Sequence, residues 1–167
     1  MLHSRLLTAL PLLVALMACE ENVPTAIRSE PPQPRSSTLQ LIGVVEPGQS
    51  NRDALFLRLG DETLVPVIGG ETEKLARVAG ARVSVHGNWS EETFDIQWFL
   101  VVEVGGVSAR DGLLLHNGQG YMLRLTGDGA IIPLTSRLPD ELLEHVGERV
   151  WITPPAGSVV AFGVIGN

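Results

Sequence analysis

Cysteine, tyrosine and lysine each occur once in this chain of 167 residues, and aromatic residues make up only 5% of it. With a single lysine, Lys74, no basic run and a formal net charge of −7, we expect no nucleic-acid partner, because such binding depends on clustered lysine and arginine. The chain has instead 18 glycines, 11 prolines and 44% hydrophobic residues. This composition is typical of a globular protein with many short strands and turns.

The only cysteine, Cys19, follows an apolar run that covers residues 6–18. This run is too short to span a bilayer, which takes about 20 residues, so residues 1–18 are predicted to be a removable signal peptide. A secretory cleavage site would place a small residue three positions before the cut. A cut after Ala18 places Leu16 there, so a different kind of signal is indicated.

The tetrapeptide Leu16-Met17-Ala18-Cys19 resembles the lipobox of bacterial lipoproteins. The resemblance implies that Cys19 becomes the first residue of the mature protein. Its sulfur would carry a diacylglyceryl group and its amine a further acyl chain such as palmitate, and two or three chains anchor a protein stably in a membrane. Cys19 would then be neither a nucleophile nor a metal ligand. The alternative is a buried free cysteine.

The residues after Cys19 indicate where the protein is located. Glu20, rather than aspartate, follows the cysteine, as in lipoproteins that are sorted to an outer membrane. The resemblance therefore implies a bacterial envelope protein on the outer membrane, facing the periplasm. Residues 19–37 are predicted to be the lipid anchor and a proline-rich tether. Packing of Val23 and Ile27 as an irregular arm is the alternative.

The remaining sequence, from residue 38 onward, contains an internal duplication. Residues 56–59 (FLRL) align with 122–125 (MLRL), and residues 75–85 align with 142–152 at nearly the same offset. Agreement over this length and in the same order predicts two repeats, at 38–105 and 106–167.

Each repeat has the same predicted order of elements. Alternation and helical spacing in the first repeat predict strands over 38–46, 54–59, 63–68, 82–86 and 93–104 and a helix over 71–79. Gly80 and Gly147 are expected to end the two helices, and Pro139 is expected at the first helical position.

Three strands, a short helix and two strands form the element order that resembles the OB fold. The predicted fold is therefore mainly β, with two tandem small five-stranded OB-like barrels, each with one short helix between strands three and four. Two SH3-like barrels, or one sandwich of two duplicated sheets, are the alternatives. So small a repeat buries little surface alone, so the two are expected to pack together.

Period-two alternation predicts a candidate ligand site in each repeat. In the second strands, Phe56 and Arg58 face outward in one repeat, as do Met122 and Arg124 in the other. An apolar side chain beside an arginine could bind an anionic or aromatic partner. Alternatively these pairs cover the seam between the repeats, or the arginines pair with acids on adjacent strands.

Trp89 lies in the predicted loop of residues 87–92 between the fourth and fifth strands of the first repeat. An exposed tryptophan there could stack on sugars or bases, and the alternative is that it folds back as a lid. Trp98 and Trp151 lie in predicted strands, where we expect them to serve packing.

The chain offers little for catalysis. His86, His116 and His145 have no second histidine at ligand spacing, so we expect no metal site and no cofactor. No serine lies in a G-x-S-x-G elbow, and no phosphate-binding loop is present. The sequence is therefore predicted not to encode an enzyme.

These patterns predict a lipid-anchored cell-envelope protein that acts as a non-catalytic binding or scaffolding module. Its expected partners are the membrane, through lipidated Cys19, and an envelope protein or a glycan. A receptor for a glycan or small anionic ligand, with Trp89, Arg58 and Phe56 lining the groove, is the alternative. A hydrolase is a third hypothesis, which requires that His86 or His116 meet a carboxylate.

Overall fold

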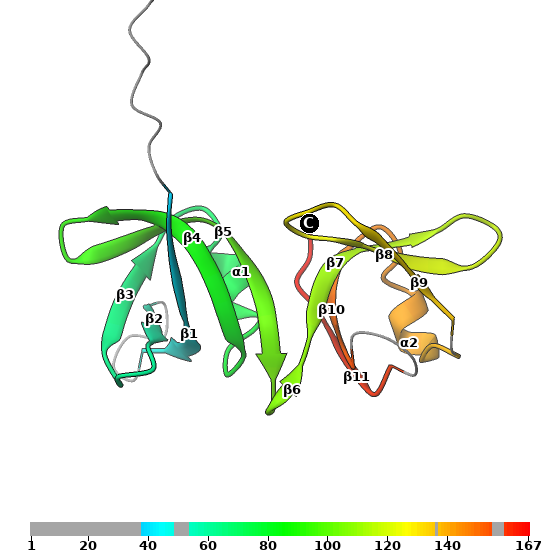
Figure 1. Ribbon diagram of the computed structural model, residues 1–167, viewed down its shortest axis with the longest axis horizontal. Coiled ribbons are helices and arrows are strands. Elements are labelled where there is room, and N and C mark those ends of the chain that lie inside the picture. The colour runs from blue at the N-terminus through cyan, green and yellow to red at the C-terminus, as the bar shows by residue number, and fades with distance from the viewer. Residues whose placement is uncertain (1–37, 49–53, 136, 155–158) are drawn as a thin grey trace, which may run out of the picture. The chain divides into compact units, whose positions relative to one another are not determined.

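The computed structural model describes residues 38–48, 54–135, 137–154 and 159–167, and the predicted signal peptide, Cys19 and the tether lie outside these ranges (Figure 1). The mainly β fold predicted from the sequence is confirmed, because the described residues form two sheets and two short helices. None of the helices in these ranges is long and apolar enough to cross a membrane.

The first sheet belongs to what we call the first half of the described chain. Its elements are β1 (Leu39–Pro47), β2 (Leu55–Arg58), β3 (Leu64–Ile68), α1 (Thr72–Ala76), β4 (Arg82–Ser90), β5 (Thr93–Val104) and β6 (Val107–Ser108). Antiparallel pairings join β3 to β2, β2 to β1, β1 to β4 and β4 to β5. A parallel pairing of Val67 with Phe94 joins β3 back to β5, so five strands form a closed cycle of neighbours.

The second sheet belongs to the second half. Its elements are β7 (Arg110–His116), β8 (Tyr121–Leu125), β9 (Ile131–Leu134), α2 (Asp140–Leu143), β10 (Arg149–Thr153) and β11 (Ala161–Val164). The strand order is β11-β10-β7-β8-β9, and every pairing is antiparallel. Within the described ranges, β9 and β11 are not paired with each other, so this sheet is open where the first one is closed.

The two sheets share the register of their first three strands. Arg58 pairs with Val44 on one side and Leu64 on the other. Arg124 occupies the same place between Leu113 and Ile131. The neighbouring positions agree as well, since Phe56 pairs with Pro66 and Met122 with Pro133.

Alternation along the strands separates core from surface as predicted. Leu55 and Leu57 of β2 are buried and Phe56 and Arg58 are half-buried, while Leu123 of β8 is fully buried. Each half has its own apolar cluster. The first cluster also includes Ala109, which lies between β6 and β7, and Ile165 of the second half, so the core of the first half is completed by residues outside it.

Several predicted boundaries differ from the structure. Both helices are shorter than predicted and end before the glycines. The last helical residue before Gly80 is Ala76, and the turn that follows contains a hydrogen bond from the amide of Ala81 to the carbonyl of Val78. Gly80 has a φ of +83°, a left-handed conformation that glycine adopts readily. It therefore lies in the turn that leads into β4 and does not cap the helix. Pro139 is the N-cap of α2 instead of its first helical residue.

Candidate functional site

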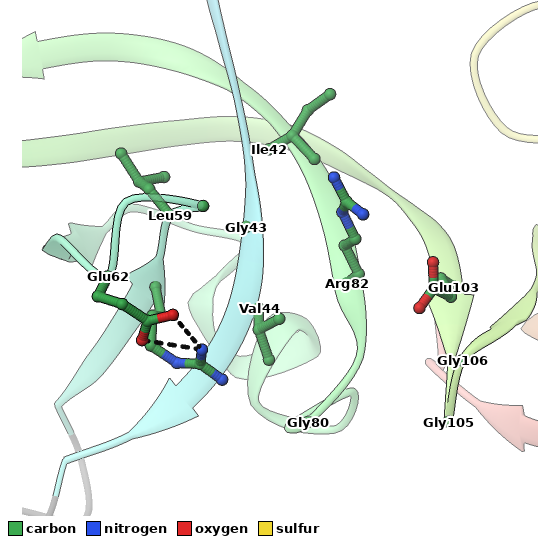
Figure 2. Close-up of a pocket in the computed structure, with 12 residues that line it drawn as sticks. Ile42, Gly43, Val44, Leu59, Glu62, Gly80, Arg82, Glu103, Gly105 and Gly106 are labelled. Atoms are coloured by element: carbon green, nitrogen blue, oxygen red, sulfur yellow. Dashed lines mark hydrogen bonds and ion pairs between the residues drawn. The ribbon is translucent and has the colours of Figure 1, made fainter.

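Arg58 is held by two carboxylates of the first half. Its Nε donates to Glu46 Oε1 on β1 at 2.5 Å, and its Nη1 donates to Glu62 Oε2 at 3.1 Å. Figure 2 marks the contacts of Glu62 by dashed lines. Hydrogen bonds to Glu46 and then to Glu62 raise the pKa of Arg58 above its ordinary value. Arg58 therefore pairs with acids nearby, which is the alternative that the sequence left open.

Arg124 occupies the matching position of the second half without either acid. Leu115 stands where Glu46 stands, since each is paired with the residue two before the arginine. Gly129 stands where Glu62 stands, because each follows an aspartate that accepts an amide hydrogen bond two residues on. Both have positive φ, 66° at Glu62 and 71° at Gly129. Arg124 is exposed and forms no ion pair within the described part of the chain.

Apolar side chains surround Arg124 on the outward face of β7, β8 and β9. The residues of this face, which we call the Arg124 face, are Leu113, Leu115, Met122, Arg124, Ile131 and Pro133. Ile131 is 58% exposed. The Arg124 face therefore combines a cation that has no carboxylate partner among the described residues with solvent-accessible apolar side chains.

Trp89 lies on β4 and not in a loop, because the pairing of β4 with β5 continues as far as Ser90 and Thr93. Trp89 is 47% exposed and packs edge-on against Phe94, with ring centroids 5.4 Å apart. The predicted groove of Trp89, Arg58 and Phe56 is not assembled in the clefts described below. One of them contains Arg58, but neither Trp89 nor Phe56 lines it.

A shallow cleft of about 350 Å³ lies at one end of the first half (Figure 2). Arg82 on β4 and Glu103 on β5 are register partners and both line it. We call it the Arg82 cleft, and its other lining residues are Ile42, Gly43, Val44, Arg58, Leu59, Gly60, Glu62, Gly80, Gly105 and Gly106. Its cations and carboxylates are balanced, so the cleft has no net preference for an anion.

The arginine of the second half that matches Arg82 is held by an internal acid. Arg149, which matches Arg82, donates from Nε to Asp111 Oδ2 at 2.7 Å and from Nη2 to the carbonyl of Phe99 at 2.6 Å. Its guanidinium carbon lies 4.4 Å from the centroid of the Phe99 ring. Asp111 also accepts the amide of Val101 at 2.9 Å. This buried ion pair joins the second half to β5 and has a structural role.

A larger cleft of about 570 Å³ lies on the outward face of β4 and β5. We call it the Trp98 cleft. The residues that line it are Gln40, His86, Trp98, Leu100, Val101, Val102, Arg110, Asp111, Leu125, Thr126, Gly127 and Asp128. The rings of Trp98 and His86 are stacked, with centroids 3.6 Å apart and planes 6° from parallel. Trp98 was expected to serve packing. The outward positions of His86 and Trp98 on paired strands are the signal that could have predicted the stack.

His86 contacts a serine rather than a carboxylate. Ser84 Oγ lies 3.3 Å from His86 Nε2 and accepts a hydrogen bond from Gln40 Nε2 at 2.7 Å. A nucleophilic serine must reach its substrate, but Ser84 is only 3% exposed. His116 is stacked at a tilt on Tyr121. The described residues contain no group of histidine, cysteine and acid side chains that could hold a metal ion.

Comparison with known proteins gives little further information. No family model and no curated protein matches the chain. One similar solved structure is described as the crystal structure of a complex of TiaS with a tRNA and ATP. The match has a TM-score of 0.31 and 15% identity, and covers 61% of this chain and 29% of the other. So low a score carries no argument about fold or function.

Proposed function

We propose that this chain is a lipid-anchored envelope protein whose two tandem OB-like repeats bind another protein without catalysing a reaction. The closed cycle β1-β2-β3-β5-β4 with α1 between β3 and β4 supports the OB-like assignment of the first repeat. The matching registers of β1–β3 and β7–β9 support the duplication. A sequence from Leu16 to Cys19 that resembles a lipobox supports the anchor.

The observation that carries the binding proposal is the difference between Arg58 and Arg124. Arg58 has Glu46 and Glu62 as partners, whereas Arg124 has Leu115 and Gly129 at the same places. An arginine without an acid partner has no energetic cost while it is exposed to water. The apolar side chains around it, in contrast, gain free energy when a partner buries them. The Arg124 face thus fits a protein surface with a carboxylate among apolar side chains, and Met122 provides the flexible apolar contact.

A glycan or small anionic ligand is the second candidate partner. The exposed indole of Trp89 favours it, because an accessible ring face can stack on a sugar. In this case Trp89 would act without Arg58, whose donors are occupied by carboxylates.

The anchor is tested by comparing wild type with Cys19→Ala in a bacterial host. We expect the wild type to gain the mass of its acyl chains and to sediment with membranes, and the variant to do neither. Equal masses and equal sedimentation of the two proteins would show that Cys19 is not lipidated.

The binding face is tested by chemical cross-linking of membranes that contain the full-length protein. We expect a cross-linked complex with the wild type that is lost in Arg124→Glu and in Leu115→Glu, since the second variant supplies Arg124 with an internal carboxylate. Arg82→Glu is the matched control, because it makes the same charge change at an exposed arginine outside the Arg124 face. A complex that survives both face variants would reject this face.

A further inference from the structure

We propose that the Trp98 cleft binds a small organic anion that has a flat apolar body, with Trp98 and Leu100 against the body and Arg110 on the charged group. This site is separate from the Arg124 face, because none of its lining residues belongs to that face. The inference goes beyond the proposed protein partner and does not depend on it.

One wall of the cleft is a rigid aromatic platform. Ser84 Oγ accepts from Gln40 on β1 and can donate its own proton to His86 Nε2, which fixes the orientation of the imidazole. The imidazole is in turn stacked on Trp98 of β5. A chain of contacts across three strands therefore holds outward-facing side chains in one arrangement. A binding surface that is already ordered loses less conformational entropy when a ligand arrives.

The opposite wall comes from β7 and from the turn after β8. Gly127 has a φ of +102°, and a Cβ placed on it would lie 3.6 Å from both methyl groups of Leu100. The turn is held by a hydrogen bond from the amide of Ala130 to Asp128 Oδ1. The turn that contains Gly127 and Asp128 is therefore held close to Leu100, which forms the floor of the cleft, and the cleft does not require a movement to form.

Arg110 is the only cationic side chain among the residues that line the cleft, apart from His86. Both carboxylate oxygens of Asp111 are occupied, one by Val101 and the other by Arg149. Burial lowers the pKa of His86, so its imidazole is neutral near pH 7. Arg110 is exposed and forms no ion pair with the residues that the structure describes. Asp128, the other charged residue of the lining without an ion pair in the described ranges, has one carboxylate oxygen occupied by the amide of Ala130. The guanidinium of Arg110 is thus the one cation of the cleft and can form a bidentate contact with a ligand carboxylate.

The size of the cleft and the residues that line it indicate what the uncharged part of the ligand is. A volume of about 570 Å³ is within the usual range for small-molecule sites. Trp98, Leu100 and Val102 present apolar surface, and Val102 is 39% exposed. A sugar would need many polar partners, and most polar groups here are already engaged by the protein. A flat aromatic or alicyclic carboxylate matches the platform, the floor and the single cation.

The test uses para-toluate as the probe and para-toluamide as its uncharged counterpart, with the full-length protein labelled with nitrogen-15. The chain has three tryptophans, so three indole N–H signals report separately, and Trp98→Phe assigns the signal of Trp98. We expect para-toluate to shift the Trp98 signal saturably and para-toluamide to bind about 10- to 150-fold more weakly, since a hydrogen bond to a charged group contributes about 1.5–3 kcal/mol.

Arg110→Gln should weaken para-toluate binding by a similar factor, and Arg82→Gln should leave it unchanged. Leu100→Trp, which fills the floor, should abolish the shift of Trp98. The inference is overturned if para-toluate leaves the Trp98 signal unmoved, if the amide binds as tightly as the acid, or if Arg110→Gln binds like wild type. Any of these results leaves the cross-linking test of the Arg124 face unaffected, so the two proposals fail separately.

Discussion

The two halves of the described chain have arginines at the same two strand positions but place their acids differently. In the first half Glu46 and Glu62 hold Arg58, and Arg82 has Ile42 where an acid could stand. In the second half Asp111 holds Arg149, and Arg124 has no acid. The arginine that is held by acids is thus the β2 arginine in the first half and the β10 arginine in the second. The difference comes from the residue diagonally across on the adjacent strand, Glu46 beside Arg58 and Asp111 beside Arg149, and not from the position of the arginine itself.

The two sheets also differ in the length of their last long strands and in whether the sheet closes. β5 extends over 12 residues and reaches back to β3, while β11 has 4 residues. The long β5 also provides Phe99 and Val101, whose backbone groups bind Arg149 and Asp111. The first half therefore has a closed cycle of strands, and its β5 supplies the groups that Arg149 and Asp111 of the second half contact. Changes in either half would test or sharpen this comparison, beginning with the one that has the largest expected effect.

Asp111→Ala should destabilise the protein most, by about 3–5 kcal/mol, which is the usual cost of removing one partner of a buried ion pair. The side chain of Asp111 is only 2% exposed, and its loss leaves the amide of Val101 without its acceptor. Arg149 would keep only the carbonyl of Phe99 and the more distant carboxylate of Glu71, at 3.9 Å. Urea unfolding measures the change. Ile42→Ala is the control at the matching site, where the 45% exposed side chain should contribute within about 0.5 kcal/mol. Equal losses in the two variants would contradict the structural role of the pair.

Gly43→Ala and Gly112→Ala should each cost about 1–3 kcal/mol, the usual range for overpacking. A Cβ on Gly43 would lie 2.6 Å from the carbonyl oxygen of Arg58, and a Cβ on Gly112 would clash with the carbonyl oxygen of Arg124. Similar losses in thermal or urea unfolding would confirm that both halves bring β-strands together at the same point. Gly60→Ala is the control, since nothing lies within 4 Å of its Cβ position, and it should be nearly neutral.

Sequence reasoning predicted the mainly β fold and the order of strands and helix. It succeeded because alternation and glycine positions are local signals that both halves of the described chain show. The helix ends were less accurate, since Gly80 and Gly147 have the positive φ expected of a helix-ending glycine but lie beyond the last helical residue. A glycine fixes where the backbone turns and not which hydrogen bond ends the helix.

The candidate site was only partly predictable. Alternation placed Arg58 and Arg124 outward but could not show that Glu46 lies beside one of them, because that depends on the register between β1 and β2. The stack of His86 on Trp98 was not predicted for the same reason, since their pairing joins strands across a bulge. Strand register is a non-local property that one repeat unit does not encode in its local pattern.

A pH titration tests the part of the first half that has no counterpart in the second, since Thr153 stands where His86 stands. Burial lowers the pKa of His86 below its usual value of 6.5, so the unfolded chain takes up the proton more readily than the folded one. Stability should therefore fall as the pH drops below about 6.5. His86→Gln should reduce this fall in urea unfolding, and His116→Gln, at an exposed position, should not. Identical pH profiles for wild type and His86→Gln would remove the argument for a neutral His86.

The smallest effect is expected from the arginines that began the comparison. Arg58→Ala should lower the urea midpoint slightly, and the loss should shrink in high salt, because its pairs with Glu46 and Glu62 are partly exposed. Arg124→Ala should leave the midpoint unchanged, since it has no partner to lose among the described residues.

Exchanging Glu46 and Leu115 for each other's residue type tests whether the acid alone explains why Arg58 contributes to stability and Arg124 does not. In a Leu115→Glu background, Arg124→Ala should acquire the small, salt-sensitive cost that Arg58→Ala has in wild type, and a double-mutant cycle isolates that pair energy. Glu46→Leu should reduce the cost of Arg58→Ala in return, although Glu62 still contributes. If Arg124 gained nothing from a glutamate at position 115, the geometry of the two halves would differ at this point despite their equal registers. The free arginine would then be a consequence of backbone shape, and not of the acids that surround its counterpart.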